Sequence, residues 1–258
     1  MVRGRSQGGF GIIIVGDELL SGRRRDRHFD HVVDVLAGRG LTLDWAHVVG
    51  DDPARLTGTL RATLAGADTV FCFGGIGATP DDRTRECAAR AAGVELVRHP
   101  GAVAEIEARF AAQAYPNRIR MAELPAGCAL IPNPYNRIPG FTLSGHHFLP
   151  GFPVMAWPML EWVLDNCHGD RRGTPPDVYT VTVLDAHESE LVSLMEALVA
   201  DYPEIRLSSL PHLGDSRPRI EVGLRGYGSS LAGASESLRA GLLRLGLRWR
   251  EGGVGSSD

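Results

Sequence analysis

The sequence predicts a doubly wound α/β domain followed by a small α+β domain. Short apolar runs alternate with amphipathic segments through residues 10–114, which is the pattern of strands and helices that alternate in an α/β sheet. Glycine-rich segments follow two of the apolar runs, at the strand ends where such sheets place ligands. A polar stretch with glycine and proline, residues 168–176, then precedes a second and shorter alternating pattern.

The first part contains four predicted strands and four predicted helices. Residues 11–15 (GIIIV) are continuously apolar and predict a central strand. The helix that follows has apolar residues at the i, i+3, i+4, i+7 spacing of one buried face, namely Phe29, Val32, Val33 and Leu36. The predicted strands are residues 11–15, 41–49, 69–73 and 94–97, and the predicted helices are residues 26–39, 52–64, 82–92 and 100–114.

Prolines and glycines interrupt the chain over residues 121–140, which we interpret as short extended pieces. Residues 141–149 place a Ser-Gly turn between two apolar runs and predict a β-hairpin. A helix over residues 154–166 completes the first domain. We place that domain at residues 10–167.

The chain beyond the linker predicts a small domain at residues 177–250. Its elements follow in the order β-α-β-β-α, which is typical of a split-βαβ, or ferredoxin-like, domain. The predicted strands are residues 178–184, 205–210 and 219–224, and the predicted helices are residues 189–200 and 229–245.

The composition argues against several classes of protein. The net charge of −4 gives no overall attraction to nucleic acid or to a membrane surface. No apolar run approaches the ~20 residues that span a bilayer, and the start of the chain, predicted as a flexible leader over residues 1–9, lacks the apolar core of a secretory signal. The four cysteines form no CxxC pair, so we expect reduced, mostly buried thiols in a cytoplasmic protein. They are Cys72, Cys87, Cys128 and Cys167.

The segment from Thr69 to Arg85 (TVFCFGGIGATPDDRTR) carries the strongest functional signal. A buried strand runs directly into the glycine loop at residues 74–77, and a helix follows the acidic pair Asp81-Asp82. Free backbone amides at such a loop can hold phosphate oxygens. Adjacent carboxylates repel each other unless a cation or donor groups separate them, and they can hold a hard metal such as Mg²⁺. The alternative is structural: the glycines form a tight turn and Asp82 caps the helix.

Two further loops follow predicted strands. Residues 16–22 (GDELLSG) contain Glu18, which either binds a metal or a donor group of the ligand or remains a solvated loop acid. Three arginines, Arg23–Arg25, follow this loop. One of them either binds an anion at the site or stays solvated. Helix capping explains one of Asp51 and Asp52, and the other can reach the same site. The histidines show no HExxH or HxH spacing, which argues against a zinc site.

Five blocks of the sequence occur together in a characteristic order and spacing: Gly16–Gly22, Val48–Asp52, Gly74–Thr84, Asn133–Phe141 and Leu149–Pro153. In this order they resemble the molybdopterin-binding-like domain of the CinA (competence/damage-inducible protein) family, over about Phe10 to Asn166. That domain is related to the MogA/MoaB/gephyrin fold of molybdenum cofactor biosynthesis. The part that follows is similar to the small domain of CinA-type chains.

The resemblance implies a three-layer α/β/α fold that binds a pterin or a nucleotide phosphate, and a homo-oligomer, either a dimer or a trimer. In some members it implies a divalent-metal-dependent pyrophosphatase that acts on ADP-ribose or dinucleotides. The sequence departs from the family pattern in two respects. The C-terminal amidase domain of full-length CinA proteins is not expected here, and Arg27-His28 stands where many relatives carry a Thr-Asn or Lys-Asn pair.

We therefore expect a metal-dependent pyrophosphatase acting on ADP-ribose or an FAD-like substrate, with a small phosphate-bearing ligand and Mg²⁺ or a similar ion as cofactor. The alternative is a non-catalytic protein that binds molybdopterin or an adenylylated pterin. An RNA-binding role of the small domain is weaker, because its strands lack the stacking aromatics and a GXXG loop. The predicted catalytic residues are Asp51, Asp81 and Asp82, and the predicted metal ligands are Glu18, Asp81 and Asp82. The predicted ligand-binding residues are Gly16, Glu18, Ser21, Gly22, Gly74, Gly75, Gly77, Thr79, Pro139, Gly140, Pro150 and Gly151.

Overall fold

The computed structural model describes residues 8–212 and 218–253, and the chain divides into two compact units after Gly173. This boundary lies within the linker predicted at residues 168–176. Each unit has its own hydrophobic core. Of the leader predicted at residues 1–9, all but the last two residues lie outside the described part of the chain.

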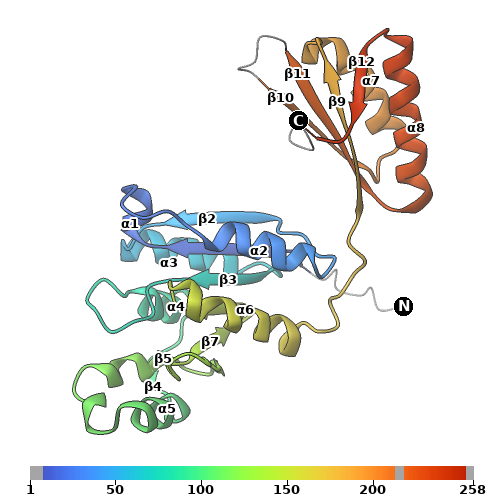
Figure 1. The fold of residues 1–258 in the computed structure, drawn as a ribbon. Helices are drawn as coiled ribbons and strands as arrows, with labels where there is room; N and C mark the ends of the chain where they lie inside the picture. Colours follow the sequence, from blue (N-terminus) through green and yellow to red (C-terminus); the bar gives the residue numbers. More distant parts are fainter. Residues whose placement is uncertain (1–7, 213–217, 254–258) are drawn as a thin grey trace. The chain divides into compact units, whose positions relative to one another are not determined.

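The first unit is built on a six-stranded sheet with the strand order β2-β1-β3-β8-β7-β6 (Figure 1). Strands β2, β1, β3 and β8 are parallel, and β7 is antiparallel to both of its neighbours. The carboxyl ends of the four parallel strands therefore meet at one edge of the sheet. The strands are β1 (Phe10–Val15), β2 (Trp45–Val49), β3 (Thr69–Phe73), β6 (Ala129–Ile131), β7 (Gly140–Leu143) and β8 (His146–Leu149).

Helices cover both faces of this sheet, because side chains of the central strand alternate between two cores. Ile13 and Val15 of β1 pack with α3, α4 and α5, whereas Ile12 and Ile14 pack with α2 and α6. The three-layer α/β/α architecture that the resemblance implied is therefore present. The helices are α1 (Asp17–Leu20), α2 (His28–Ala37), α3 (Pro53–Leu64), α4 (Thr84–Ala92), α5 (Pro100–Phe110) and α6 (Pro153–Cys167), with short 3₁₀ turns η1 (Ala111–Ala114) and η2 (Arg118–Ala122).

The strand predicted at residues 94–97 does not join the main sheet, as simple alternation would require. Strand β4 (Leu96–Arg98) pairs with β5 (Glu123–Pro125) in a separate antiparallel ribbon. Its side chains are half-buried or exposed, whereas a strand inside a covered parallel sheet needs apolar side chains on both faces. The hairpin strands β7 and β8 extend the main sheet instead.

The buried face of α2 is not the predicted one, because two of the four predicted residues are exposed and a histidine is buried in their place. His28, Val32 and Leu36 are buried, whereas Phe29 and Val33 are 45% and 37% exposed. The His28 ring stacks on Phe73 of β3, with ring centroids 4.3 Å apart, and takes the core position that the spacing assigned to phenylalanine. The sequence pattern counted only apolar residues and therefore missed a histidine that packs as an aromatic ring.

The hairpin predicted at residues 141–149 is confirmed. Its two turn residues, Ser144 and Gly145, have φ angles of 48° and 79°, and positive values at both positions are the requirement of a type I′ turn. The turn places β8 beside β3, so that Pro150 to Phe152 begin at the same sheet edge as the glycine loop.

The second unit has the element order β-α-β-β-α-β and an antiparallel sheet with the strand order β10-β11-β9-β12. Helices α7 and α8 share one core with Val181, Val183 and Val222 of the sheet. The sequence analysis missed the fourth strand, whose RWRE sequence shows only weak alternation. The elements are β9 (Asp177–Leu184), α7 (Glu188–Asp201), β10 (Arg206–His212), β11 (Arg219–Gly226), α8 (Gly228–Arg244) and β12 (Arg248–Glu251).

All four cysteines are free thiols, and Cys167 alone among them is exposed. Within the described ranges, no helix combines the length and the apolar character that a membrane crossing requires.

Candidate functional site

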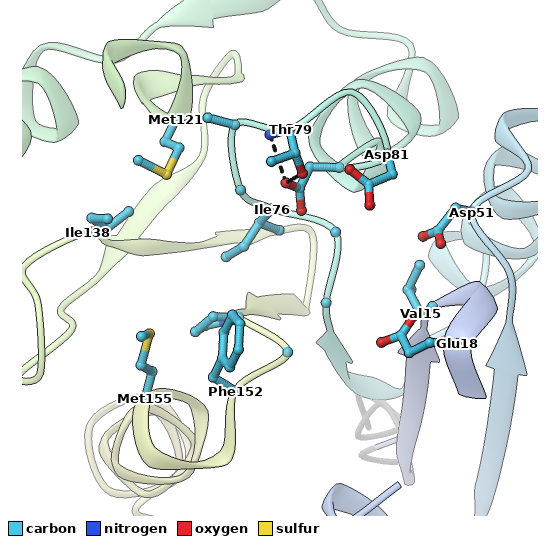
Figure 2. Close-up of a pocket in the computed structure, with 18 of the residues that line it drawn as sticks. Val15, Glu18, Asp51, Ile76, Thr79, Asp81, Met121, Ile138, Phe152 and Met155 are labelled. Atoms are coloured by element: carbon cyan, nitrogen blue, oxygen red, sulfur yellow. Dashed lines mark hydrogen bonds between the residues drawn. The ribbon is translucent and has the colours of Figure 1, made fainter. Parts of the chain in front are cut away.

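A cavity of about 450 Å³ opens where the parallel strands of the first unit end (Figure 2). It is lined by the loops after β1, β2 and β3, by the turn after β8, and by the loop that precedes β7. The structure thus brings together predicted residues from four separate stretches of sequence. The predicted residues that line the cavity are Gly16, Glu18, Asp51, Gly74, Gly75, Gly77, Thr79, Asp81, Asp82, Pro150 and Gly151.

The start of α4 holds the glycine loop from behind. The buried Thr84 hydroxyl donates to the Gly74 carbonyl at 2.9 Å, and the Thr84 amide donates to the Gly75 carbonyl at 3.0 Å. In a trans peptide the C=O and the following N–H point in opposite directions, so the amides of Gly75 and Ile76 face away from α4. Neither amide has an acceptor within the described residues. The Gly74 amide, which we expected to be available, donates to the Leu149 carbonyl at 2.9 Å.

Two of the loop glycines are required by the backbone. Gly74 and Gly75 have φ angles of 102° and 68°, which L side chains rarely adopt. A Cβ on Gly74 would lie 2.5 Å from the Val15 carbonyl oxygen, and a Cβ on Gly75 would lie 2.2 Å from the Thr84 hydroxyl. The glycines therefore form a tight turn, and this does not argue against ligand binding. Because α4 bonds the carbonyl side of the loop, the amides on the other side are left without a partner.

Asp82 is not the N-cap of the helix. The N-cap position belongs to Arg83, whose side chain makes no capping bond. One Asp82 carboxylate oxygen accepts instead from the Thr79 amide at 2.9 Å and from the Thr79 hydroxyl at 2.5 Å. The same hydroxyl, followed by the backbone of the turn, lowers the pKa of the exposed Asp81 carboxyl, which keeps that group ionised.

Asp51 is held at the cavity by a reciprocal pair of hydrogen bonds. The Asp17 amide donates to the Asp51 carboxylate at 2.9 Å, and the Asp51 amide donates to the Asp17 carboxylate at 3.1 Å. Burial, followed by the negative charges of Asp17, Glu18 and Asp81, raises the pKa of Asp51. Its neighbour Asp52 caps α3 by accepting from the Arg55 amide at 2.8 Å. Asp17 thus positions Asp51, a role that the sequence analysis did not assign.

Four predicted residues do not line the cavity. The Ser21 hydroxyl donates to the Glu18 carbonyl, and Gly22 adopts a φ of 71° in open space at the end of α1. Pro139 and Gly140 are buried at the start of β7, where a Cβ on Gly140 would lie 2.4 Å from the Phe148 carbonyl oxygen. Gly22 thus belongs to the turn after α1, and Gly140 belongs to the sheet. Ile138, which precedes Pro139, lines the cavity instead.

The opposite end of the cavity is apolar (Figure 2). Phe152 is 56% exposed and lines the cavity, so it is not a core residue. The two asparagines of this end are largely bonded within their own loop: the Asn133 side chain bonds the Ile138 carbonyl and the Tyr135 amide, and Asn136 accepts from the Ile138 amide. The sequence predicts Phe152 either on the pocket wall or in the core. It does not indicate the rest of this wall, because those residues come from separate elements that form no motif. The apolar residues are Ile76, Met121, Ile138, Phe152 and Met155.

Arg24 is the one basic side chain that lines the cavity in the described part of the chain. Its guanidinium lies 5.5 Å from the centre of the Phe152 ring and 3.5 Å from the Gly151 carbonyl oxygen. The His28 Nε2 atom lies 3.2 Å from the same carbonyl. Burial lowers the pKa of His28, so the neutral ring can donate a hydrogen bond that fixes this turn. Of the Arg23–Arg25 cluster, Arg24 is therefore the arginine that lines the cavity.

The carboxylates at this edge do not form a ready-made metal cage. Within residues 8–212 and 218–253, no group of three or more His, Cys, Asp or Glu side chains has the arrangement of a metal site. Burial is the main cause of the raised pKa of Asp51, but the negative charges of Asp17, Glu18 and Asp81 add to it, and a cation would relieve that repulsion. Mg²⁺ usually binds one or two carboxylates together with substrate phosphates rather than an all-protein cage. The residues present fit that mode of binding.

Residues 11–168 match the family model described as "Probable molybdopterin binding domain". The chain belongs to this family. It is 34% identical to a CinA-like protein from Citrifermentans bemidjiense over 205 residues (76% of this chain, 49% of the relative), and 30% identical to a CinA-like protein from Desulforapulum autotrophicum over 262 residues (93% of this chain, 61% of the relative). The resemblance to CinA proteins is thus confirmed, and the chain spans about half the length of several curated relatives it matches.

A solved structure of a CinA protein of unknown function from Thermoplasma acidophilum has the same fold as the first unit. It is 30% identical, covers 62% of this chain and 99% of its own length, and superposes with a TM-score of 0.57. The likeness covers the unit that carries the cavity.

Proposed function

We propose that the protein is a metal-dependent pyrophosphatase that cleaves a nucleotide-linked diphosphate such as that of ADP-ribose or FAD. One observation supports this most directly: Glu18, Asp51 and Asp81, from the segments that follow three different parallel strands, line one cavity with the glycine loop. Carboxylates suit a hard cation, and unbonded backbone amides suit phosphate oxygens. The apolar wall at the other end suits a flat heterocycle.

In this proposal each group has a separate task. The amides of Gly75 and Ile76 stabilise charge that develops on the phosphate oxygens, and Arg24 binds a further phosphate oxygen. Asp81, which is ionised, and Asp51, whose pKa is raised, supply the carboxylates for the metal and for the attacking water. A bound divalent cation would supply neutralisation of the diphosphate charge and activation of water.

The test is the release of AMP from ADP-ribose and from FAD with added Mg²⁺ or Mn²⁺. We expect turnover by the wild-type chain and a loss of at least 100-fold in Asp81→Asn, about 2.7 kcal/mol in the barrier. Asp52→Asn is the matched control, because Asp52 caps α3 and does not line the cavity. An absence of turnover across both substrates and both metals would reject the proposal.

The second candidate is a protein that binds molybdopterin or an adenylylated pterin without cleaving it. The feature that favours it is the lack of a three-carboxylate metal group within the described residues, together with the apolar wall. Pterin fluorescence that copurifies with the protein would support this candidate. Cleavage of the bound ligand on addition of metal would exclude it.

A further inference from the structure

One side chain behind the glycine loop has no role in the function proposed above. Arg85, in the first turn of α4, is only 6% exposed. Its guanidinium donates to three backbone carbonyl groups: Nη2 to Gly77 at 2.8 Å, and Nη1 to Arg120 at 2.6 Å and to Glu123 at 2.9 Å. A single side chain therefore joins the glycine loop to the segment around η2 that carries Met121 into the cavity.

The charge of Arg85 has no close counter-ion. No carboxylate lies within 4.0 Å of its guanidinium among the residues that the structure describes, and its Nε atom is buried without a hydrogen-bond partner. The carboxylates of Glu123, Asp82 and Glu86 attract it from farther away. A buried guanidinium remains protonated at neutral pH, so a positive charge lies directly behind the loop. A buried charge is costly unless hydrogen bonds and opposite charges offset it, and here three carbonyl groups and more distant carboxylates do so.

The hydrogen bond to Gly77 also sets the direction of a peptide. The Gly77 carbonyl points toward Arg85, so the following Ala78 N–H points away from it. The Ala78 amide has no acceptor within the described residues, and both Gly77 and Ala78 line the cavity. Arg85 thus orients the Ala78 amide by holding the preceding carbonyl, in the same way that Thr84 orients the amides of Gly75 and Ile76.

We propose that Arg85 is a positioning residue for the anionic part of the ligand: it turns the Ala78 amide into the cavity and provides, through one peptide group, the positive charge that balances the bound phosphates. This inference rests on the proposed function in one respect, that the cavity holds a diphosphate-bearing ligand. The need for a positive charge follows from the charged residues that line the cavity. Four carboxylates and one arginine line the cavity, and a diphosphate adds further negative charge.

The experiment compares three variants of the full chain. Arg85→Gln removes the charge and retains a donor, Arg85→Lys retains the charge with fewer donors, and Arg90→Gln removes the same charge from an exposed position of the same helix. Calorimetry without metal gives the dissociation constants for ADP-ribose and for inorganic pyrophosphate. We expect Arg85→Gln to weaken both by about 10- to 100-fold, as the loss of a charge-assisted interaction implies. Arg85→Lys should recover most of this loss, and Arg90→Gln should change neither value by more than about twofold.

A second measurement reports on the amide itself and uses the wild-type chain. In amide NMR spectra, addition of pyrophosphate should shift the Gly75, Ile76 and Ala78 resonances. In Arg85→Gln the Ala78 shift should be lost, while the Gly75 and Ile76 shifts persist, because Thr84 still donates to the Gly74 and Gly75 carbonyls, which orient those two amides. A residue that only packs the fold would lower the melting temperature of the variant without changing this pattern.

Two outcomes overturn the inference. One is an Ala78 amide that does not respond to pyrophosphate in the wild-type chain, a result that stands even if Arg85→Gln fails to fold. The other is a folded Arg85→Gln variant with wild-type affinity for both ligands. If the wild-type chain binds ADP-ribose with these shifts but does not cleave it with metal, the proposed activity fails and the inference about Arg85 stands.

Discussion

Alanine at Gly75 tests whether the glycine loop is as tightly packed as the structure describes. The φ angle of Gly75 is 68°, and a Cβ would lie 2.2 Å from the Thr84 hydroxyl oxygen. To relieve this contact the Thr84 hydroxyl has to rotate and give up its buried 2.9 Å hydrogen bond to the Gly74 carbonyl. Gly75→Ala therefore combines a strained dihedral angle with the loss of a buried hydrogen bond.

The two costs can be estimated separately. An L residue in the left-handed region costs about 1–2 kcal/mol. A buried carbonyl left without a donor costs about 1–3 kcal/mol. The free energy of unfolding of the first unit should therefore fall by roughly 2–5 kcal/mol. Gly93→Ala is the matched control, because Gly93 has a φ of 69° with no atom within 4 Å of the added Cβ, and only the dihedral cost applies there.

Urea unfolding followed by tryptophan fluorescence provides the assay. Of the four tryptophans in the chain, Trp249 alone lies in the second unit. A Trp249→Phe background therefore restricts the signal to the first unit and avoids two overlapping transitions. The reasoning is refuted if Gly75→Ala destabilises this unit no more than Gly93→Ala does. Thr84→Ala offers a further check: combined with Gly75→Ala it should cost at least about 1 kcal/mol less than the sum of the single changes, because the clashing hydroxyl is gone.

Three other predictions follow from charge and exposure. Burial raises the folded-state pKa of Asp51, so the protonated carboxyl stabilises the fold fully below the unfolded value of about 3.9, and this stabilisation is lost as pH rises through the folded value. Asp51→Asn should therefore gain stability relative to wild type as pH rises above about 4, and a difference that does not change with pH would contradict this. Burial lowers the pKa of His146 to about 4 and of His147 to about 3. The free energy of unfolding should therefore be unaffected by these histidines above about pH 6.5 and should fall below that pH, by about 2 kcal/mol per histidine at pH 5. An equal fall in a variant with glutamine at both positions would show that the two histidines are not its cause. Phe152→Ala should weaken ADP-ribose binding by about tenfold and leave pyrophosphate binding unchanged in calorimetry; equal losses would show that the ring is not near the heterocycle.

Features set by neighbouring residues were predictable from the sequence. The Ser144-Gly145 turn, the capping of α3 by Asp52 and the glycine loop after β3 all follow from residues within a few positions of each other. Local chemistry specifies such features, because the turn type or the cap is determined by the residues that form it. It was also predictable that Glu18 and Asp51 lie at the same edge of the sheet, because each follows a strand and the carboxyl ends of parallel strands meet at one edge.

Features that depend on distant contacts were not predictable. β4 pairs with β5 across more than twenty residues of helix and 3₁₀ turn, and nothing in its three residues specifies that partner. Met121 and Met155 reach the cavity from separate elements, and an isolated methionine is indistinguishable in sequence from a core residue. The structural alternative for Asp82 was a helix cap, because aspartate favours that position, but its bonds to Thr79 form a tighter turn just before the helix.

The charges around the cavity connect these findings. Glu18, Asp51 and Asp81 repel one another and would also repel a diphosphate, so the lining by itself opposes the ligand that its amides suit. Besides Arg24, two positive contributions can offset this: a divalent cation among the carboxylates, and the guanidinium of Arg85 behind the glycine loop. They act on different sides of the phosphate group, since Arg85 reaches it only through the Gly77–Ala78 peptide, whereas a cation would contact the oxygens directly. Removal of the metal should therefore leave measurable ligand binding, and the further removal of the Arg85 charge should weaken that binding by about 10- to 100-fold.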